Sequence, residues 1–327
     1  MDLVAFGEGL IRLTPDRNQR LEQAGAFVPH VGGAELNVAV GASRLGLKTA
    51  WVSKLSDTPL GRMIRNKARE HGVETKDICW TDSGRTGLYF LELGATPRNT
   101  SVMYDRSHSA FSTIRKNDLD WDAVLSGAKC LLITGITPAV SPEAADAARL
   151  AIQTARQKGC LVCMDLNYRA KLWSVARARQ TLGAMVPDVD ILVTTAGDTE
   201  TVLGITAAND ERLAEDLEQR YGCGIVAVTH REGSTVWKNR WSALVRSGGV
   251  TMKSRVYEVD IVDQVGRGDA FVAGLLAGYL PGKDLGRGLD YGVAFSALKH
   301  SIPGDLNWCD AADVERLLAG PAPGVSR

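Results

Sequence analysis

Short apolar runs rich in β-branched residues alternate along this chain with longer segments of helical periodicity, and this alternation most limits what the chain can fold into. Such a rhythm is typical of a parallel β-sheet whose strands are joined by crossover helices. Strands are expected at residues 3–6, 50–53, 130–134, 160–165, 191–194 and 225–229. We therefore predict an α/β fold with a mainly parallel sheet.

Helix ends are marked between these runs. Ser141 followed by Pro142 has the pattern of an N-cap and a first-turn proline, and Gly159 supplies the matching C-terminal stop. The segment 270–279 is apolar on nearly every face, so we expect it to form a central, buried helix.

Two stretches, residues 11–29 and 76–112, show alternating character and turn residues instead of long helices. We assign both to one small β-rich lid. A lid beside a large α/β core would form a cleft suited to a small ligand. The core would then comprise residues 1–10, 30–75 and 113–319, with a flexible tail at 320–327.

Charge and composition exclude several classes of function. The chain has 38 basic and 38 acidic residues, so no long-range field favours nucleic acid or an anionic membrane. It has no basic leader and no apolar stretch near eighteen residues, and its six cysteines lack a framework spacing. We expect a cytoplasmic protein with reduced thiols, acting on small molecules.

The strongest candidate for chemistry is Gly266-Arg267-Gly268-Asp269, between a strand-like run and the apolar helix. Glycines let the backbone approach a ligand, and the first amides of a helix bind anions. Asp269 is placed to accept a proton from an attacking hydroxyl while the amides stabilise a transferred phosphoryl group. The alternative is a plain glycine turn before an aspartate that complements the helix dipole.

Four segments in order along the chain carry a recognisable pattern: residues 32–39 (GGAELNVA), 165–173 (DLNYRAKLW), 263–271 (DQVGRGDAF) and 297–305 (ALKHSIPGD). Together they resemble the ribokinase-like, phosphofructokinase B type carbohydrate kinases, most of all their 2-keto-3-deoxygluconate kinase branch. The resemblance implies a three-layer α/β/α core with a small β-sheet lid. It also implies transfer of the γ-phosphoryl group of ATP to a terminal hydroxyl of a 2-keto-3-deoxy sugar acid.

The resemblance implies that Asp269 is the catalytic base and that the amides of residues 266–268 form an anion hole. Arg106 and Arg169 are expected to hold the carboxylate of a sugar acid, because a guanidinium binds carboxylate in a planar, bidentate way. Glu8 would either bond a sugar hydroxyl or pair with a nearby lysine. Further residues expected at the sugar are Gly33, Ala34, Asn37, Tyr89 and Tyr104.

For the nucleotide, the resemblance implies that magnesium arrives with ATP. A departure from the family pattern makes Asp198 the candidate magnesium-linked acid, with Glu200 as the alternative in another register. Gln264 replaces the usual threonine, which leaves a monovalent cation site open, and Arg267 replaces a small residue and would contact phosphate or solvent. Nucleotide contacts are expected at Thr229, Gly233, Gly266, Gly268, Ala294, Ala297 and Lys299.

Other hypotheses about the function stay open at this point. A kinase for fructose or another neutral ketose would share the fold, and a non-catalytic sugar- or nucleotide-binding protein would explain the altered magnesium element. A nucleoside kinase is disfavoured, since Arg106 and Arg169 would then face an uncharged ribose. The gluconate and galactonate epimers are not distinguished, and a homodimer through the lid is expected because that sheet would have exposed edges.

Overall fold

The computed structural model describes residues 1–16, 18–233 and 237–320, so most of the tail expected at 320–327 lies outside the described residues. Its main sheet has the order β13-β12-β11-β10-β9-β8-β1-β4-β5, with β14 paired to β12. Neighbours are parallel from β11 across to β5, and β12, β13 and β14 add antiparallel pairs at the other edge. The strands are β1 (Leu3–Phe6), β4 (Thr49–Ser56), β5 (Ile78–Thr81), β8 (Cys130–Thr134), β9 (Leu161–Asp165), β10 (Ile191–Thr194), β11 (Ile225–Gly233), β12 (Lys238–Ser247), β13 (Val250–Lys253) and β14 (Tyr257–Asp260).

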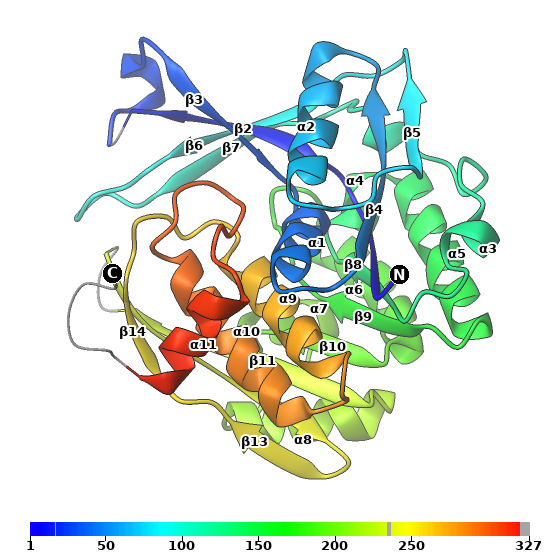
Figure 1. The fold of residues 1–327 in the computed structure, drawn as a ribbon, viewed down its shortest axis with the longest axis vertical. Coiled ribbons are helices and arrows are strands. Elements are labelled where there is room, and N and C mark those ends of the chain that lie inside the picture. The colour runs from blue at the N-terminus through cyan, green and yellow to red at the C-terminus, as the bar shows by residue number, and fades with distance from the viewer. Residues whose placement is uncertain (17, 234–236, 321–327) are drawn as a thin grey trace.

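Helices cover both faces of this sheet (Figure 1), and each face has its own hydrophobic core. This confirms the predicted α/β class with a mainly parallel sheet. One layer holds α1 (Ala34–Arg44), α2 (Pro59–Glu70), α9 (Arg267–Tyr279), α10 (Leu285–Lys299) and α11 (Ala311–Ala319). The other holds α3 (Trp121–Val124), α4 (Thr137–Val140), α5 (Pro142–Gln157), α6 (Val175–Met185), α7 (Ala196–Leu203) and α8 (Asp210–Tyr221). Short 3₁₀ turns lie at Leu21–Gln23, Phe111–Thr113 and Val186–Asp188.

Helix α9 is the central helix that its apolar sequence predicted. Every residue from Asp269 to Gly278 is buried, and the helix packs against α1 and α10. Its amino end therefore sits at a fixed place in the core, which matters for the site below.

A second, smaller sheet has the order β3-β2-β6-β7 and extends from the main body at the upper left of Figure 1. Its strands β2 and β6 are parallel, and its outer pairs are antiparallel. Phe27, Val28 and Met103 are large hydrophobic side chains exposed on these strands. The homodimer through this sheet stays a prediction. The strands are β2 (Leu10–Pro15), β3 (Phe27–Gly32), β6 (Gly87–Glu92) and β7 (Ser101–Asp105).

One part of the segment 76–112 expected in the lid lies elsewhere. Strand β5 pairs in parallel with β4, with Ser53 opposite Ile78, and forms the edge of the main sheet. The reason is the preceding helix α2, which crosses over and returns the chain parallel to β4. The proposed lid segment therefore begins after Thr81.

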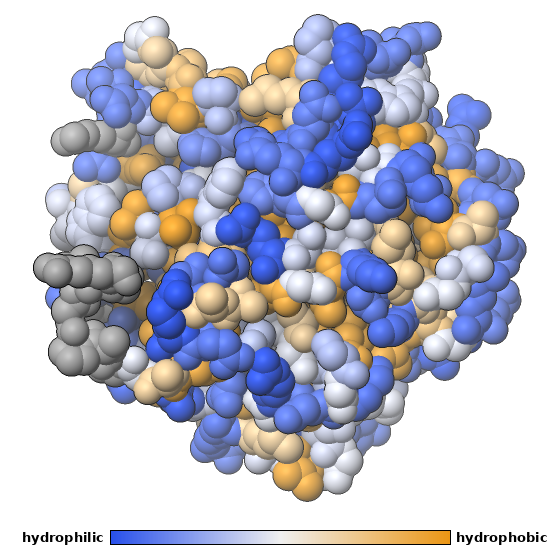
Figure 2. Space-filling view, viewed as in Figure 1, coloured by the Kyte–Doolittle hydropathy of each residue, from blue (hydrophilic) through white to orange (hydrophobic). Residues whose placement is uncertain are grey.

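In the part of the chain that the structure describes, none of the helices is long and apolar enough to cross a bilayer. On the face drawn in Figure 2, hydrophilic and hydrophobic side chains are intermingled.

The predicted N-cap of α5 can be tested by substitution. Ser141 accepts a hydrogen bond from the Ala144 amide at 3.0 Å. We expect Ser141→Ala to lower the free energy of unfolding by about 1 kcal/mol in urea denaturation, because a helix amide loses its acceptor. Ser126→Ala, at an exposed position, is the control and should change stability by less than about 0.5 kcal/mol. Equal effects of the two substitutions would contradict the capping role.

Candidate active site

A pocket of about 760 Å³ lies between the small sheet, the carboxyl ends of the central strands and the amino ends of α7 and α9. This is the place where open parallel sheets bind their ligands. The described residues that line it include most of the predicted set: Gly33, Ala34, Asn37, Tyr89, Tyr104, Arg106, Arg169, Asp198, Thr229, Gly266, Arg267, Gly268 and Asp269. Gly233, Ala294, Ala297 and Lys299 are outside this lining set.

The turn before α9 brings Asp269 to the pocket. Gly266 has φ 81°, and a Cβ at this position would collide with the carbonyl oxygen of Asp305. A residue with a side chain cannot make this approach, which explains the glycine physically. The amides that open α9 have no acceptor within the helix, so they could donate hydrogen bonds to an anion in the pocket.

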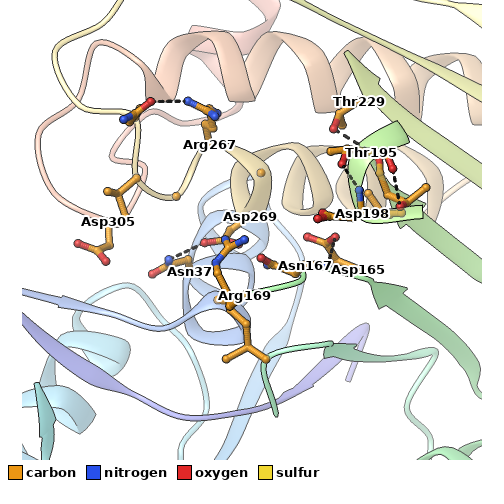
Figure 3. Close-up of a pocket in the computed structure, with 18 of the residues that line it drawn as sticks. Asn37, Asp165, Asn167, Arg169, Thr195, Asp198, Thr229, Arg267, Asp269 and Asp305 are labelled. Carbon is orange, nitrogen blue, oxygen red and sulfur yellow. Dashed lines mark hydrogen bonds between the residues drawn. The ribbon is translucent and has the colours of Figure 1, made fainter. Parts of the chain in front are cut away.

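Asp269 is the third residue of α9 and is 8% exposed. Asn37, from α1, donates a hydrogen bond from Nδ2 to Asp269 Oδ2 at 2.7 Å, as Figure 3 shows. Burial raises the pKa of Asp269 to about 6, against the opposing effects of Asn37 and the Arg169 charge. A carboxyl group with this pKa is ionised at neutral pH and is still basic enough to accept a proton.

Two unused acceptors lie near this carboxylate. Asn37 Oδ1 and Glu8 Oε1 are buried atoms of pocket-lining residues, and neither has a hydrogen-bond partner among the residues described. Gly33 supports this arrangement, since a Cβ at its φ of 149° would collide with the Glu8 carbonyl. Buried acceptors without donors are costly, so they favour a ligand that brings hydroxyl groups.

Arg106 and Glu8 form a buried ion pair at the lid side of the pocket. Arg106 Nε donates to Glu8 Oε2 at 2.9 Å, and Nη2 contacts the same oxygen. Of the two expectations for Glu8, pairing with a lysine is wrong, because its partner is this arginine. The pairing balances the charge of Arg106, which leaves it less free to bind an anion than its sequence position indicated.

Arg169 remains as a charged group without a carboxylate partner in the described part of the chain. Its Nη1 donates to the Tyr168 carbonyl at 3.1 Å, and its side chain is exposed. In Figure 3 the guanidinium extends to the neighbourhood of Asp269 and Asn37. Its positive charge lowers the pKa values of Asp165, Asp198 and Asp269, although burial outweighs this effect in each case.

Asp165 and Asp198 form an acidic pair at the other end of the pocket (Figure 3). Asp165 ends β9, and Asp198 is positioned by the N-cap Thr195, whose Oγ1 accepts from the Asp198 amide at 3.1 Å. Burial, with the nearby Asp198 charge, raises the pKa of Asp165 to about 8. Glu200 is exposed and outside the lining set, so the geometry favours the register that places Asp198 at this position.

Asp165 and Asn167 were not predicted from the sequence as site residues. Both line the pocket, and Asn167 adopts a φ of 38° that turns the chain directly after β9. A signal was present, because both belong to the segment that carried the family resemblance and follow the carboxyl end of a strand. Across the residues that the structure describes, no group of three or more His, Cys, Asp or Glu could hold a metal by itself.

Arg267 lines the pocket, whereas Lys299 lies outside its lining. Arg267 donates to Gln264 Oε1 at 2.9 Å and lies over the Trp241 ring at 5.9 Å from its centroid, so it is held against the protein rather than in solvent. Lys299 was expected beside the nucleotide but is fully buried, and its Nζ donates to the Ile302 carbonyl at 2.8 Å. The difference arises because α10 ends there and the side chain bends back beneath the turn.

Comparison with known proteins places the chain in a family. The pfkB family of carbohydrate kinases matches residues 1–308. A 2-dehydro-3-deoxygalactonokinase of Haloferax volcanii is 40% identical over 326 residues, covering 100% of this chain and 99% of the relative. A 5-dehydro-2-deoxygluconokinase of Geobacillus thermodenitrificans is 30% identical over 304 residues, covering 91% and 87%.

Among solved structures, a 2-dehydro-3-deoxygluconokinase from Thermotoga maritima superposes with a TM-score of 0.95 at 38% identity, covering 98% of each chain. The chain therefore belongs to the pfkB family of carbohydrate kinases and has the ribokinase-like α/β fold.

The pKa of Asp269 predicts how activity depends on pH. A base must be deprotonated, so kcat/KM should fall about tenfold per pH unit below about pH 6 and level off above it. Asn37→Ala removes a hydrogen bond that lowers the pKa of Asp269, so the acid limb should move to higher pH. Because wild type and Asn37→Ala are assayed with the same substrates, titration of the substrates affects both pH profiles equally and cancels in the comparison. Asn66→Ala, at an exposed site on α2, is the control. An acid limb that stays in place in Asn37→Ala would argue against Asp269 as the base.

Proposed function

We propose that this carbohydrate kinase transfers the γ-phosphoryl group of ATP to a terminal hydroxyl of a 2-keto-3-deoxy sugar acid. The observation that carries the proposal is the guanidinium of Arg169, which lies beside Asp269 and has no carboxylate partner among the described residues, in a pocket that also holds unused hydroxyl acceptors. The relatives named for 2-dehydro-3-deoxygalactonate and 2-dehydro-3-deoxygluconate support the same substrate class.

Arg169 would bind the substrate carboxylate. A guanidinium that lacks a carboxylate partner in the free protein gains charge-assisted hydrogen bonds when an acid enters. Arg106 would contribute less to carboxylate binding than the sequence indicated, because Glu8 already accepts from two of its nitrogens. Tyr89 and Tyr104, which pack at 5.9 Å between ring centroids, would form the lid wall of the sugar site.

Asp269 would act as the base on the attacking hydroxyl. Asn37 orients the carboxylate through Nδ2 and keeps Oδ1 free to accept from a sugar hydroxyl. Glu8 Oε1 would accept from a second hydroxyl. The amides of residues 266–268 would stabilise negative charge on the phosphoryl group in flight, which is the main task in this kind of transfer.

Magnesium would enter with ATP near Asp165, Asp198 and Asn167. Carboxylate and amide oxygens are the ligands that this ion prefers, so the donor set fits it. When bound, the ion neutralises charge on the phosphates. ATP itself would lie along Thr229 and Asp198, toward the turn at Gly266.

A kinase for a neutral ketose is the second candidate, favoured by the Glu8–Arg106 pair, which removes one cation from the sugar site. A panel of coupled ATP-consumption assays with 2-keto-3-deoxygluconate, 2-keto-3-deoxygalactonate, 5-keto-2-deoxygluconate and fructose decides between them. Fructose as the best substrate would overturn the sugar-acid proposal.

Arg169 gives the sharpest test of substrate class. Arg169→Leu should raise KM for the sugar acid by about 10- to 100-fold, the loss expected for charge-assisted hydrogen bonds, and should leave any turnover of fructose unchanged. Arg177→Leu is the matched control, since Arg177 is an exposed arginine on α6 outside the pocket lining. A KM that Arg169→Leu leaves at the wild-type value would remove Arg169 as the carboxylate ligand.

The base is tested by Asp269→Asn. We expect kcat to fall by about 10²- to 10⁴-fold. Thermal stability at neutral pH should not fall, because burial disfavours the charged carboxylate in the folded protein and the amide relieves that cost. Asp146→Asn, on the exposed face of α5, controls for the loss of one acid. Activity that survives in Asp269→Asn would contradict the assignment.

A further inference from the structure

A buried network of ionised groups lies directly beneath the turn that opens α9. Asp263 precedes the turn and Asp305 touches its far side, where Gly266 packs on the Asp305 backbone. Arg12 of β2 pairs with both acids, at 2.6 Å from Asp263 and 3.3 Å from Asp305. Both acids and Arg12 have side chains no more than 3% exposed, so solvent does not screen the network.

Lys299, the last residue of α10, is the fourth charged member of this network. It is 0% exposed, and both Asp263 and Asp305 attract its ammonium group. Burial lowers its pKa to about 8, so the group still carries its charge at neutral pH. Its Nζ donates to the Ile302 carbonyl at 2.8 Å, in the loop that leads to Asp305.

The charges of the network balance. Within the network, the carboxylates of Asp263 and Asp305 face two cationic side chains, those of Arg12 and Lys299, so these four charges sum to zero. Asp269, in the pocket, also attracts Lys299, and its charge is opposed there by that of Arg169. Burial raises the pKa of Tyr89, which bonds Asp305, and lowers the pKa values of the adjacent His30 and His300, so these three stay neutral. A further cation at this place would leave an uncompensated buried charge.

Three of the four carboxylate oxygens of the network accept hydrogen bonds. Asp263 Oδ1 accepts from the Val265 amide at 3.0 Å, and its Oδ2 accepts from Arg12 and from the Gly304 amide at 2.9 Å. Asp305 Oδ1 accepts from Tyr89, and Asp305 Oδ2, which has no hydrogen-bond donor among the described residues, is ion-paired with Arg12 Nη1 at 3.3 Å. The residues present therefore do not fit the monovalent cation that the family resemblance raised, and Gln264 is turned away to Arg267.

We propose that Lys299, with Arg12, is the chain's own cation beneath the anion-binding turn, so that this kinase works without a monovalent metal ion. Lys299 is a positioning residue: it holds the loop at Ile302 and the acids that support Gly266, and touches neither substrate. The inference rests on the proposed function only in assigning residues 266–268 to phosphoryl transfer.

Wild-type enzyme gives the first test. Turnover is measured in potassium chloride and in tetramethylammonium chloride at equal ionic strength, since the organic ion is too large to enter a buried site. We expect kcat/KM to agree within about twofold. Activation by potassium of about tenfold or more would overturn the proposal, whatever any variant does.

Lys299→Met removes the charge and leaves the buried acids in excess. We expect kcat to drop at least about tenfold. Potassium should restore part of the lost kcat, because a small cation can take the place of the missing ammonium group beside the buried acids. Lys54→Met is the control for loss of a lysine charge, since Lys54 is part-buried and bonded to a carboxylate, Asp118 at 2.7 Å, but lies outside the pocket lining and the network. A Lys299→Met enzyme that is fully active, or impaired and unresponsive to potassium, would contradict the inference.

Melting temperature provides a readout that needs no substrate. A cation that binds only the folded state raises Tm, so potassium should raise the Tm of Lys299→Met by a few degrees over tetramethylammonium and leave wild type unchanged. A potassium-dependent rise in wild-type Tm would count against the proposal. If no sugar acid is turned over, the proposed function fails while the melting comparison still decides the cation question.

Discussion

The close approach of Gly266 to the backbone of Asp305 is the contact on which the rest of the site depends. It allows the turn to lie flat against the loop after α10, so that α9 can begin inside the core with its amino end open to the pocket. The start of α9 at this point also sets the positions of Asp269 and of the amides in the first turn of the helix. The buried acids that flank this contact would repel one another, and Arg12 and Lys299 compensate their charge.

Much of the fold could be predicted because its signals are local. Apolar runs gave the parallel strands closely, and the Ser141 cap and the all-apolar segment of α9 are features that the backbone itself requires. Strand β5 was misplaced in the lid since a short half-exposed strand at a sheet edge looks like any other β segment, and only the crossover through α2 returns it beside β4.

Predicted residues that follow a glycine turn, such as Asn37 and Asp269, do line the pocket. Pairing between side chains was much harder to foresee. Nothing near Arg106 in the chain indicates that Glu8, 98 residues away, would engage it, and nothing in the sequence around Lys299 indicates that its charged side chain is fully buried. Such pairings depend on burial and on the balance of charges in three dimensions, which a linear pattern does not contain.

The pocket is assembled from two sheets of different kinds. Tyr89, Tyr104 and Arg106 come from the small sheet and the residue after it, whereas Asp269, Asp165 and Asp198 belong to the helices and strands of the main body. Under the proposed function, the small sheet supplies only the lid wall of the sugar site, whereas Arg169 and the groups that handle the phosphates belong to the main body. Exchanging a few residues of β6 and β7 would therefore reshape the space around the sugar while its carboxylate ligand and the turn before α9 stay as they are.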